Sequence, residues 1–254
     1  MALVAALAAL IAPAPTPIDK LVEAVAPERA VPRMASATIG HSAEGRPIRA
    51  RAMNGLGEGP LILVFGCIHG DECAGIRAAA RAWRGCPPYG SGLITVANLN
   101  PDGRVIGTRL NANGVDLNRN FAYDWRQIGR PGDPEHSGYF PFSQPESFIA
   151  RRLIRTLQPD VTIWFHQQAE PLVRAWGPSI PAARTYARLA GERFVAMPWM
   201  DGTAPNWQNH AFPGTTSFVV ELPTEGPVDA NAHGRAIFEL GGALMGVQTL
   251  SSRG

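Results

Sequence analysis

Short runs of apolar residues alternate along the chain with longer stretches in which apolar residues recur at helical spacing. The short runs are rich in β-branched residues and are mostly bounded by Gly, Pro or Asn, a pattern typical of β-strands. The predicted strands are Ile48–Met53, Leu61–Cys67, Gly92–Asn98, Val161–Phe165, Leu172–Trp176 and Thr216–Glu221. Because most of these runs are apolar throughout, we expect a sheet that is covered on both faces.

Helical patterns lie between the predicted strands. The segment Ser143–Glu146 has the S-x-x-E form of a capping box, and Ile149 and Leu157 belong to the apolar stripe that follows it. Asp229 is a candidate cap for a last helix, whose apolar stripe runs over Ile237–Val247. Strands that alternate with helices predict a single α/β domain with a mixed, mostly parallel sheet and helices on both faces.

Composition excludes two classes of function. The chain has 254 residues, a formal net charge of +2 and no run of Lys and Arg. It therefore lacks the basic stripe expected of a protein that binds nucleic acid. No apolar stretch reaches the roughly 20 residues that cross a bilayer, so no stable membrane span is expected.

The N-terminal residues 2–12 form an unbroken apolar segment, and a proline-rich stretch follows it. Its length fits the hydrophobic region of a secretory signal, with small residues where cleavage would occur. The lack of Lys or Arg before the segment, together with Pro15 and Pro17 near the cleavage site, argues against that interpretation. We expect residues 1–16 to be a signal segment that directs export to the periplasm, cell wall or extracellular space; otherwise the protein would be cytoplasmic.

The three cysteines, Cys67, Cys73 and Cys86, cannot all pair within the chain. If residues 74–84 are helical, Cys73 and Cys86 lie roughly 20 Å apart at 1.5 Å per residue, too far for a disulfide. Cys67 and Cys73 are close enough in the sequence to meet. We nevertheless expect small buried thiols.

A long segment without regular structure is predicted over residues 122–142, which contain Gly, Pro and several aromatic residues. Loops of this length are uncommon inside compact domains and are often functional. We expect this loop to form a rim of the functional cleft, although surface packing would also explain its aromatic residues.

The most informative local pattern is His69-Gly70-Asp71-Glu72, directly after a predicted strand. An imidazole and a carboxylate three positions apart at such a place can face one point. Zinc in hydrolytic sites accepts nitrogen and oxygen ligands and typically takes three from the protein, leaving one position for water. Since His and Glu fall three apart by chance in many proteins, the pattern needs support from the rest of the chain.

His166 and Glu221 supply that support. His166 follows the predicted strand Val161–Phe165, and Glu221 ends another apolar run. Sites in α/β folds form at the carboxyl ends of strands. We therefore expect His69, Glu72 and His166 to form a His₂Glu zinc site, with Glu221 as the base for the bound water. A structural histidine and a solvent-facing glutamate are the alternatives.

Residues 100–121 are dense in polar, turn-forming residues and contain three arginines. Arginine forks bind carboxylates and stabilise developing oxyanions. A solvated loop is the alternative interpretation of this segment.

Taken in order, these motifs resemble the zinc carboxypeptidase family, whose members are also called metallocarboxypeptidases or funnelins. The resemblance runs from about Thr38 to Pro223 and rests on several separate motifs. These are HGDE at 69–72, NPDG at 100–103, RLNANGVDLNRNF at 109–121, WFHQ at 164–167 and VVELP at 219–223. Within the family, the sequences at 111–121 and 143–146 are most similar to the bacterial murein peptide amidases.

The resemblance implies a metal centre with one Zn²⁺ per chain, bound by His69, Glu72 and His166. It also implies that the carboxylate of Asp116 orients His69 from behind, a common arrangement at zinc sites. Residues 17–254 would form the catalytic domain.

The resemblance also assigns the substrate-binding and catalytic residues. Arg109 would polarise the scissile carbonyl and hold the oxyanion, and Asn118 with Arg119 would bind the terminal carboxylate of the substrate. Glu221 would be the general acid and base. Glu146 stays outside this set because the capping box explains it.

One departure concerns the loop before Glu221. Digestive members of the family have a mobile tyrosine there, whereas residues 197–214 contain Trp199, Trp207 and His210 but no tyrosine. Closure over the substrate must therefore differ.

An acidic side chain on the pocket floor would favour a basic or diaminopimelate-like terminal residue, and an apolar one would favour a hydrophobic residue.

The expected function is zinc-dependent hydrolysis of a peptide or amide bond beside a residue with a free carboxylate. The resemblance points to cell-wall peptides of the γ-D-glutamyl-diaminopimelate type, so the expected partner is a muropeptide. The alternatives are a general carboxypeptidase acting on peptide C-termini and a deacylase of N-acyl amino acids. A non-catalytic peptide-binding protein would need to have lost a ligand or the base, and the chain retains them all.

Overall fold

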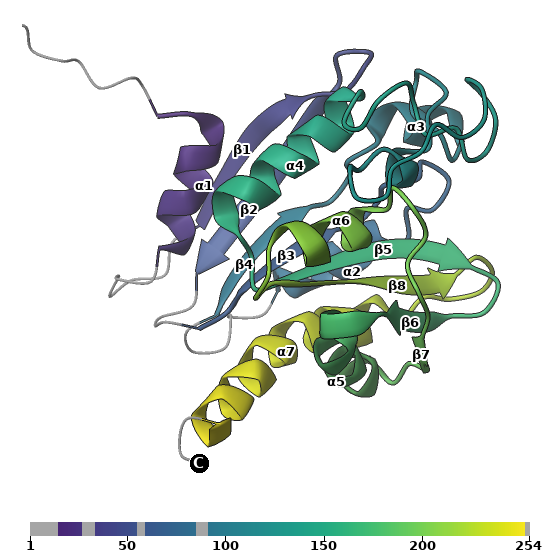
Figure 1. Ribbon diagram of the computed structural model, residues 1–254. Helices are drawn as coiled ribbons and strands as arrows, with labels where there is room; N and C mark the ends of the chain where they lie inside the picture. The colour runs from purple at the N-terminus through teal and green to yellow at the C-terminus, as the bar shows by residue number, and fades with distance from the viewer. Residues whose placement is uncertain (1–14, 27–33, 55–58, 85–90, 252–254) are drawn as a thin grey trace, which may run out of the picture.

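The computed structural model describes residues 15–26, 34–54, 59–84 and 91–251, which are built around one β-sheet (Figure 1). The strands are β1 (Met34–His41), β2 (Pro47–Asn54), β3 (Leu61–Phe65), β4 (Gly92–Val96), β5 (Val161–Gln168), β6 (Leu172–Ala175), β7 (Phe194–Ala196) and β8 (Thr216–Pro223). The helices are α1 (Pro17–Val25), α2 (Gly75–Ala82), α3 (Pro101–Ile106), α4 (Pro145–Leu157), α5 (Ile180–Ala190), α6 (Ala204–Ala211) and α7 (Ala230–Ser251), with short 3₁₀ turns η1 (Leu117–Arg119) and η2 (Gly177–Ser179).

The strand order is β1-β2-β4-β3-β5-β8-β6-β7. The four central strands β4, β3, β5 and β8 run parallel to one another. The pairs β2–β4 and β6–β8 are antiparallel and attach the two edges of the sheet. The predicted mixed, mostly parallel sheet is confirmed.

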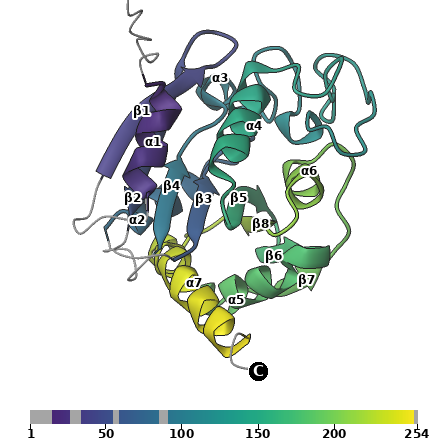
Figure 2. The same cartoon turned by 60° about the vertical axis from the view of Figure 1, so that its left-hand side comes forward.

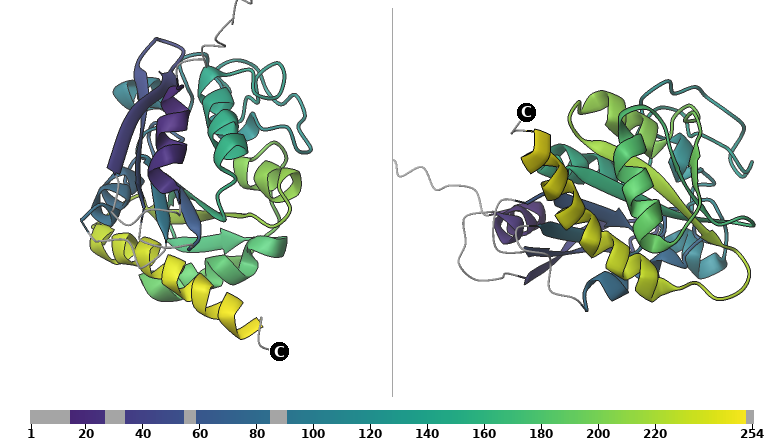
Figure 3. Two further views of the ribbon diagram at one scale, coloured as in Figure 1. Left: turned by 90° about the vertical axis from the view of Figure 1, so that its left-hand side faces the viewer. Right: turned by 90° about the horizontal axis from the view of Figure 1, so that it is seen from below.

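Helices cover both faces of the sheet (Figures 2 and 3). One face packs against α1, α4 and α6, and the other against α2, α5 and α7. Because successive residues of a strand point to opposite faces, Leu63 and Phe65 of β3 join the first core whereas Ile62 and Val64 join the second. This two-sided burial explains why β3 is apolar at every position.

Strands β5 and β8 are longer than the sequence predicts, and this places two functional candidates side by side. Their parallel pairing continues from Val161 opposite Thr216 as far as Gln168, so that His166 lies opposite Glu221. Both residues are therefore inside paired strands, and His166 belongs to β5 itself rather than following it. Paired residues on neighbouring strands are about 4.8 Å apart and point to the same face.

The predicted capping box at α4 is wrong. The helix begins at Pro145 with Gln144 as its N-cap, and no side chain caps it. The carboxylate of Glu146 is fully buried and instead accepts hydrogen bonds from the Ala43 backbone amide and from Nδ2 of Asn111, both at 3.0 Å. Burial raises the pKa of Glu146. Its role is thus to tie α4 to the β1–β2 turn.

The last helix begins as the sequence predicts. Asp229 Oδ1 accepts hydrogen bonds from the backbone amides of Asn231 and Ala232, each at 3.0 Å. Ile237 and Leu240 of the predicted stripe are buried.

Some predictions lie outside what the structure describes, namely residues 1–14 of the expected signal segment, Cys86 and the side chain of Val247. Thr16 is described and caps α1 through a hydrogen bond from the Asp19 amide. Among the described residues, no helix combines the length and the apolar character that crossing a bilayer requires.

A buried hydrogen bond between β5 and β8 tests this packing. Trp164 Nε1 donates to Ser217 Oγ at 3.0 Å, and both residues are fully buried. Replacing Ser217 by Ala leaves the indole N–H without a partner, which we expect to lower the free energy of unfolding by about 1–3 kcal/mol. Urea unfolding measures the change, with Ser36→Ala on the exposed edge strand as the control. Equal stability of the two variants would contradict the assigned bond.

Candidate active site

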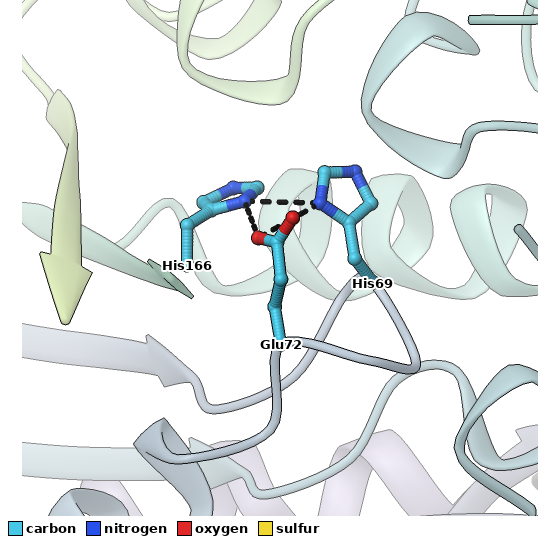
Figure 4. A group of neighbouring side chains, drawn as sticks. All are labelled: His69, Glu72 and His166. Carbon is cyan, nitrogen blue, oxygen red and sulfur yellow. Dashed lines mark hydrogen bonds and ion pairs between the residues drawn. The ribbon is translucent and has the colours of Figure 1, made fainter. Parts of the chain in front are cut away.

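Three side chains from two segments converge on one point (Figure 4). His69 and Glu72 come from the loop between β3 and α2, and His166 comes from β5. Oε2 of Glu72 is 3.0 Å from Nδ1 of each histidine, and the two Nδ1 atoms are 3.2 Å apart. Ligands around a tetrahedral zinc at 2.0–2.1 Å are separated by roughly 3.3 Å. The donor types and their spacing therefore fit a single metal ion.

The loop that carries His69 and Glu72 is shaped by a close backbone contact. A Cβ atom on Gly70 would lie 2.1 Å from the carbonyl carbon of Gly103 in α3. Only glycine fits there, so the HGDE and NPDG segments pack backbone against backbone. Asn100 caps α3 by accepting from the Gly103 amide, and its Nδ2 donates to the Leu110 carbonyl. These contacts place the chain around Arg109 beside the HGDE loop.

A disulfide between Cys67 and Cys73 closes the same loop. The expectation of free buried thiols at these two positions is therefore wrong. The loop folds back on itself so that the two Cα atoms are 4.6 Å apart, within the range that a disulfide bridges. His69 and Glu72 both lie within the closed ring.

Asp116 is the buried acceptor behind the site. Its Oδ1 accepts from His69 Nε2 at 2.9 Å and from the Asn118 amide at 2.8 Å. Its Oδ2 accepts from Nε and Nη2 of Arg109 at 3.1 and 2.9 Å. His69 thus directs Nδ1 toward the metal-binding point and Nε2 toward a carboxylate, as metal-ligating histidines commonly do.

The carboxylates set the electrostatics of the site. Burial favours the neutral imidazole, but Asp116 and Glu72 outweigh it and raise the pKa of His69 to about 9. Burial likewise opposes the charge on the two carboxylates, but the imidazoles hold the pKa of Glu72 well below its usual range, and His69 with Arg109 does the same for Asp116. The two carboxylates, Glu72 and Asp116, thus favour positive charge at the point where a metal cation would bind.

The predicted substrate-binding residues surround the same point. Nη1 of Arg109 donates to Glu72 Oε1 at 2.8 Å. Arg119 is 4% exposed and donates through Nη2 to Oε1 of Glu135 at 2.8 Å. The side chain of Asn118 accepts from the Ala204 amide at the start of α6.

A cavity of about 210 Å³ brings these groups together. Its walls include the three metal-binding candidates together with Arg109, Asn118, Arg119 and Glu221. Glu221 is 8% exposed and lies opposite His166 in the sheet. Asp116 is wholly buried behind the cavity wall. Every site residue predicted from the sequence therefore belongs to one place in the fold.

The loops predicted to shape the cleft contribute unequally. No residue of 122–142 lines the cavity, although Glu135 of that loop binds Arg119. Trp199 lines the cavity, whereas Trp207 packs into the first core. His210 stacks on Tyr123 with ring centroids 3.6 Å apart.

Sequence reasoning missed Arg174, which lines the cavity from β6. The pocket thus presents a basic side chain, whereas the sequence analysis considered only an acidic or an apolar one. The signal was weak because Arg174 stands in a short apolar strand with no motif around it.

Comparisons with known proteins find relatives of this chain in sequence and in structure. A sequence model described as zinc carboxypeptidase matches residues 93–225. Murein peptide amidase A of Escherichia coli (strain K12) is 35% identical over 115 residues, which cover 41% of this chain and 48% of that protein. Murein peptide amidase A of Vibrio campbellii is 30% identical over 149 residues, which cover 52% and 55%. The chain thus spans about half the length of the curated relatives it matches.

Solved structures share the fold. Carboxypeptidase A from Helicoverpa armigera has a TM-score of 0.70 at 18% identity, over 83% of this chain and 68% of that structure. The murein-tripeptide amidase from Escherichia coli O157 has a TM-score of 0.62 at 24% identity, over 83% and 91%. A metal, typically zinc, is a property of the matched family, and His69, Glu72 and His166 form the group that could bind it.

The position of Asp116 predicts that it controls metal affinity. Replacing Asp116 by Asn keeps the shape but removes the charge behind His69, and we expect about 10- to 100-fold weaker zinc binding. Competition with a chromophoric chelator measures the affinity. Asp71→Asn, an exposed change in the same loop, is the control. Equal affinities for both variants would contradict the role given to Asp116.

The disulfide predicts a redox-dependent stability. Replacing both Cys67 and Cys73 by Ser opens a short ring, and we expect a loss of about 2 kcal/mol in the free energy of unfolding. Dithiothreitol should lower the urea midpoint of the wild-type protein and of Cys86→Ser, but leave that of the double variant unchanged. A wild-type midpoint that ignores the reductant would rule out the bond.

Proposed function

Because the chain belongs to the zinc carboxypeptidase family, we propose that it hydrolyses the amide bond beside a residue with a free carboxylate in bacterial cell-wall peptides of the γ-D-glutamyl-diaminopimelate type. The observation that carries this proposal is the convergence of a metal-binding group, a carboxylate and an arginine fork in one cavity. The names of the murein peptide amidase relatives support the choice of a cell-wall substrate.

His69, Glu72 and His166 hold one Zn²⁺ in this proposal. When bound, zinc supplies a Lewis acid that lowers the pKa of a water molecule and polarises the scissile carbonyl. The second oxygen of Glu72 and the Nε2 atom of His69 are held by Arg109 and Asp116. Because both ligands are fixed from behind, the site is organised before a substrate arrives.

Glu221 is the general acid and base. Its register opposite His166 places its carboxylate beside the metal-binding group, on the same face of the sheet. From there it takes the proton of the attacking water and passes it to the leaving amine. The cavity wall leaves Glu221 only 8% exposed, which limits competition from bulk water.

Arg119 and Asn118 bind the terminal carboxylate of the substrate. Arg119 already binds a carboxylate, that of Glu135, whose own side chain is 58% exposed. A substrate carboxylate can take the place of this exposed partner without leaving the buried guanidinium unpaired. Arg109, at the metal-binding group, stabilises the charge that develops on the carbonyl oxygen.

We place the protein outside the cytoplasm. The apolar N-terminal residues 2–12 have the length of a signal region, and a cell-wall substrate is reached by export. The Cys67–Cys73 disulfide supports this location because disulfides persist in oxidising compartments and are rare in the cytosol.

The function is tested with the tripeptide L-alanyl-γ-D-glutamyl-meso-diaminopimelate. The zinc-loaded protein should release diaminopimelate, detected by mass spectrometry, and a chelator should stop the release. Zinc-loaded protein that leaves this peptide intact while cleaving ordinary blocked dipeptides would overturn the substrate assignment and favour a general carboxypeptidase.

The role of Glu221 is tested by Glu221→Gln. We expect turnover to fall by at least about 10²-fold with zinc content unchanged, because Glu221 is outside the metal-binding group. Glu225→Gln, an exposed change just beyond the same strand, is the matched control and should keep full activity. Turnover near the wild-type rate in Glu221→Gln would refute the assignment.

A further inference from the structure

Arg174 is a charged residue of the cavity that the proposed reaction does not use. It lies on β6 opposite Val219 of β8, in the antiparallel pair that also sets Leu172 opposite Glu221. Diagonal neighbours in such a pair are about 7–8 Å apart, within reach of long side chains. Arg174 thus projects into the same cavity as Glu221, from the neighbouring strand.

The guanidinium of Arg174 is poorly paired. Its Nη2 donates to the Pro198 carbonyl at 3.5 Å, the outer limit of a hydrogen bond. Its buried Nε has no hydrogen-bond partner among the residues that the structure describes. No other hydrogen bond and no ion pair of this side chain forms within the described part of the chain. A guanidinium carries five donors, so most of its capacity is unused.

Among the described residues, the one acceptor that hydrogen-bonds to Arg174 is the distant Pro198 carbonyl. Trp199 lies under the guanidinium, with the Arg174 Cζ 5.5 Å from the ring centroid. The buried Nε1 of Trp199 likewise has no hydrogen-bond partner in the described segments. Burial lowers the pKa of Arg174, the attraction of Glu221 opposes this shift, and repulsion by Arg119 adds to it. Two unsatisfied donor groups side by side indicate that the missing partner is an acceptor.

Arg119, unlike Arg174, is paired with a carboxylate of the protein. Arg119 has a carboxylate partner in Glu135, which stands where a terminal carboxylate would bind. Arg174 has no such partner in the described residues. Arg109 is paired with Glu72 and Asp116, which leaves Arg119 and Arg174 to face the cavity. These two guanidinium groups are best neutralised by an occupant with two anionic groups, since an unpaired charge in a half-buried place is costly.

We propose that Arg174 binds a second carboxylate, carried by the side chain of the same substrate residue whose terminal carboxylate binds Arg119. This inference rests on the proposed function and names its substrate class: peptides whose leaving residue is a dicarboxylic amino acid. The remote carboxylate of diaminopimelate and the side chain of glutamate share this chemistry. Arg174 is a specificity-determining residue, and the bond cleavage itself does not depend on it.

A matched pair of peptides isolates the second carboxylate. Lysine is diaminopimelate without its remote carboxylate, so L-alanyl-γ-D-glutamyl peptides ending in meso-diaminopimelate or in L-lysine differ at the proposed contact alone. We expect the wild-type zinc-loaded protein to prefer the diaminopimelate peptide in kcat/KM by roughly 10- to 100-fold, the range of a charge-assisted hydrogen bond. Arg174→Gln should abolish the preference by slowing the diaminopimelate peptide alone.

Two further variants control this experiment. Arg174→Lys keeps the charge and should retain part of the preference. Arg193→Gln removes an exposed arginine of the neighbouring segment, which is paired with Glu170, and should leave both rates unchanged. Equal slowing of both peptides by Arg174→Gln, or a wild-type protein that does not distinguish them, would overturn the assignment.

Binding measured without turnover gives an independent result. Calorimetry with zinc-loaded Glu221→Gln should show the same preference for the diaminopimelate peptide, and Glu221→Gln/Arg174→Gln should lose it. If the wild-type protein cleaves neither muropeptide, the proposed function fails, and blocked dipeptides ending in Glu or Gln then test Arg174. A Glu preference lost in Arg174→Gln would retain the anion contact, and no preference would refute it.

Discussion

The site depends on the hydrogen bonds that the carboxylate of Asp116 accepts. One fully buried side chain accepts from the imidazole of His69, from two nitrogens of Arg109 and from the amide that opens the 3₁₀ turn carrying Asn118 and Arg119. Each of these donors comes from a different part of the site. Because a buried charge is tolerated only when it is fully hydrogen-bonded, the folded state fixes all of them at once. The metal-binding candidate His69, Arg109 and the turn that carries Arg119 are thus positioned by one anion.

Much of the fold could be predicted from local pattern. The six strands predicted from apolar runs are all present, because burial on two faces leaves a continuous signal. The unpredicted strands β1 and β7 lie at the two edges of the sheet, where one side of the strand has no neighbour and the apolar signal is weaker. The capping box at Ser143–Glu146 failed because Glu146 finds its partner at Ala43, far away in the sequence. Local spacing carries no information about such a contact.

Some site residues can likewise be predicted from local sequence, whereas others depend on contacts across the sheet. His69 and Glu72 are neighbours in the sequence, so a motif reports them, and the resemblance to a family supplied the roles of Arg109 and Arg119. The register that sets His166 beside Glu221 is a property of two strands paired across the sheet, and no local pattern contains it. Arg174 was missed because its place in the site also depends on strand pairing. It enters the cavity through the antiparallel β6–β8 pair and belongs to no motif.

The three arginines of the cavity are held to different degrees, and the difference orders their tasks. Arg109 is fixed by two carboxylates that belong to the buried site, so its position does not depend on a substrate. Arg119 is paired with the exposed Glu135 and can exchange that partner for a ligand. Within the part of the chain that the structure describes, Arg174 contacts a carbonyl at 3.5 Å and an aromatic ring. Pairing within the protein thus decreases from Arg109, beside the metal-binding candidates, through Arg119 to Arg174. In the proposed reaction, this gradient keeps the groups around the metal rigid and leaves Arg174 to be paired by the substrate.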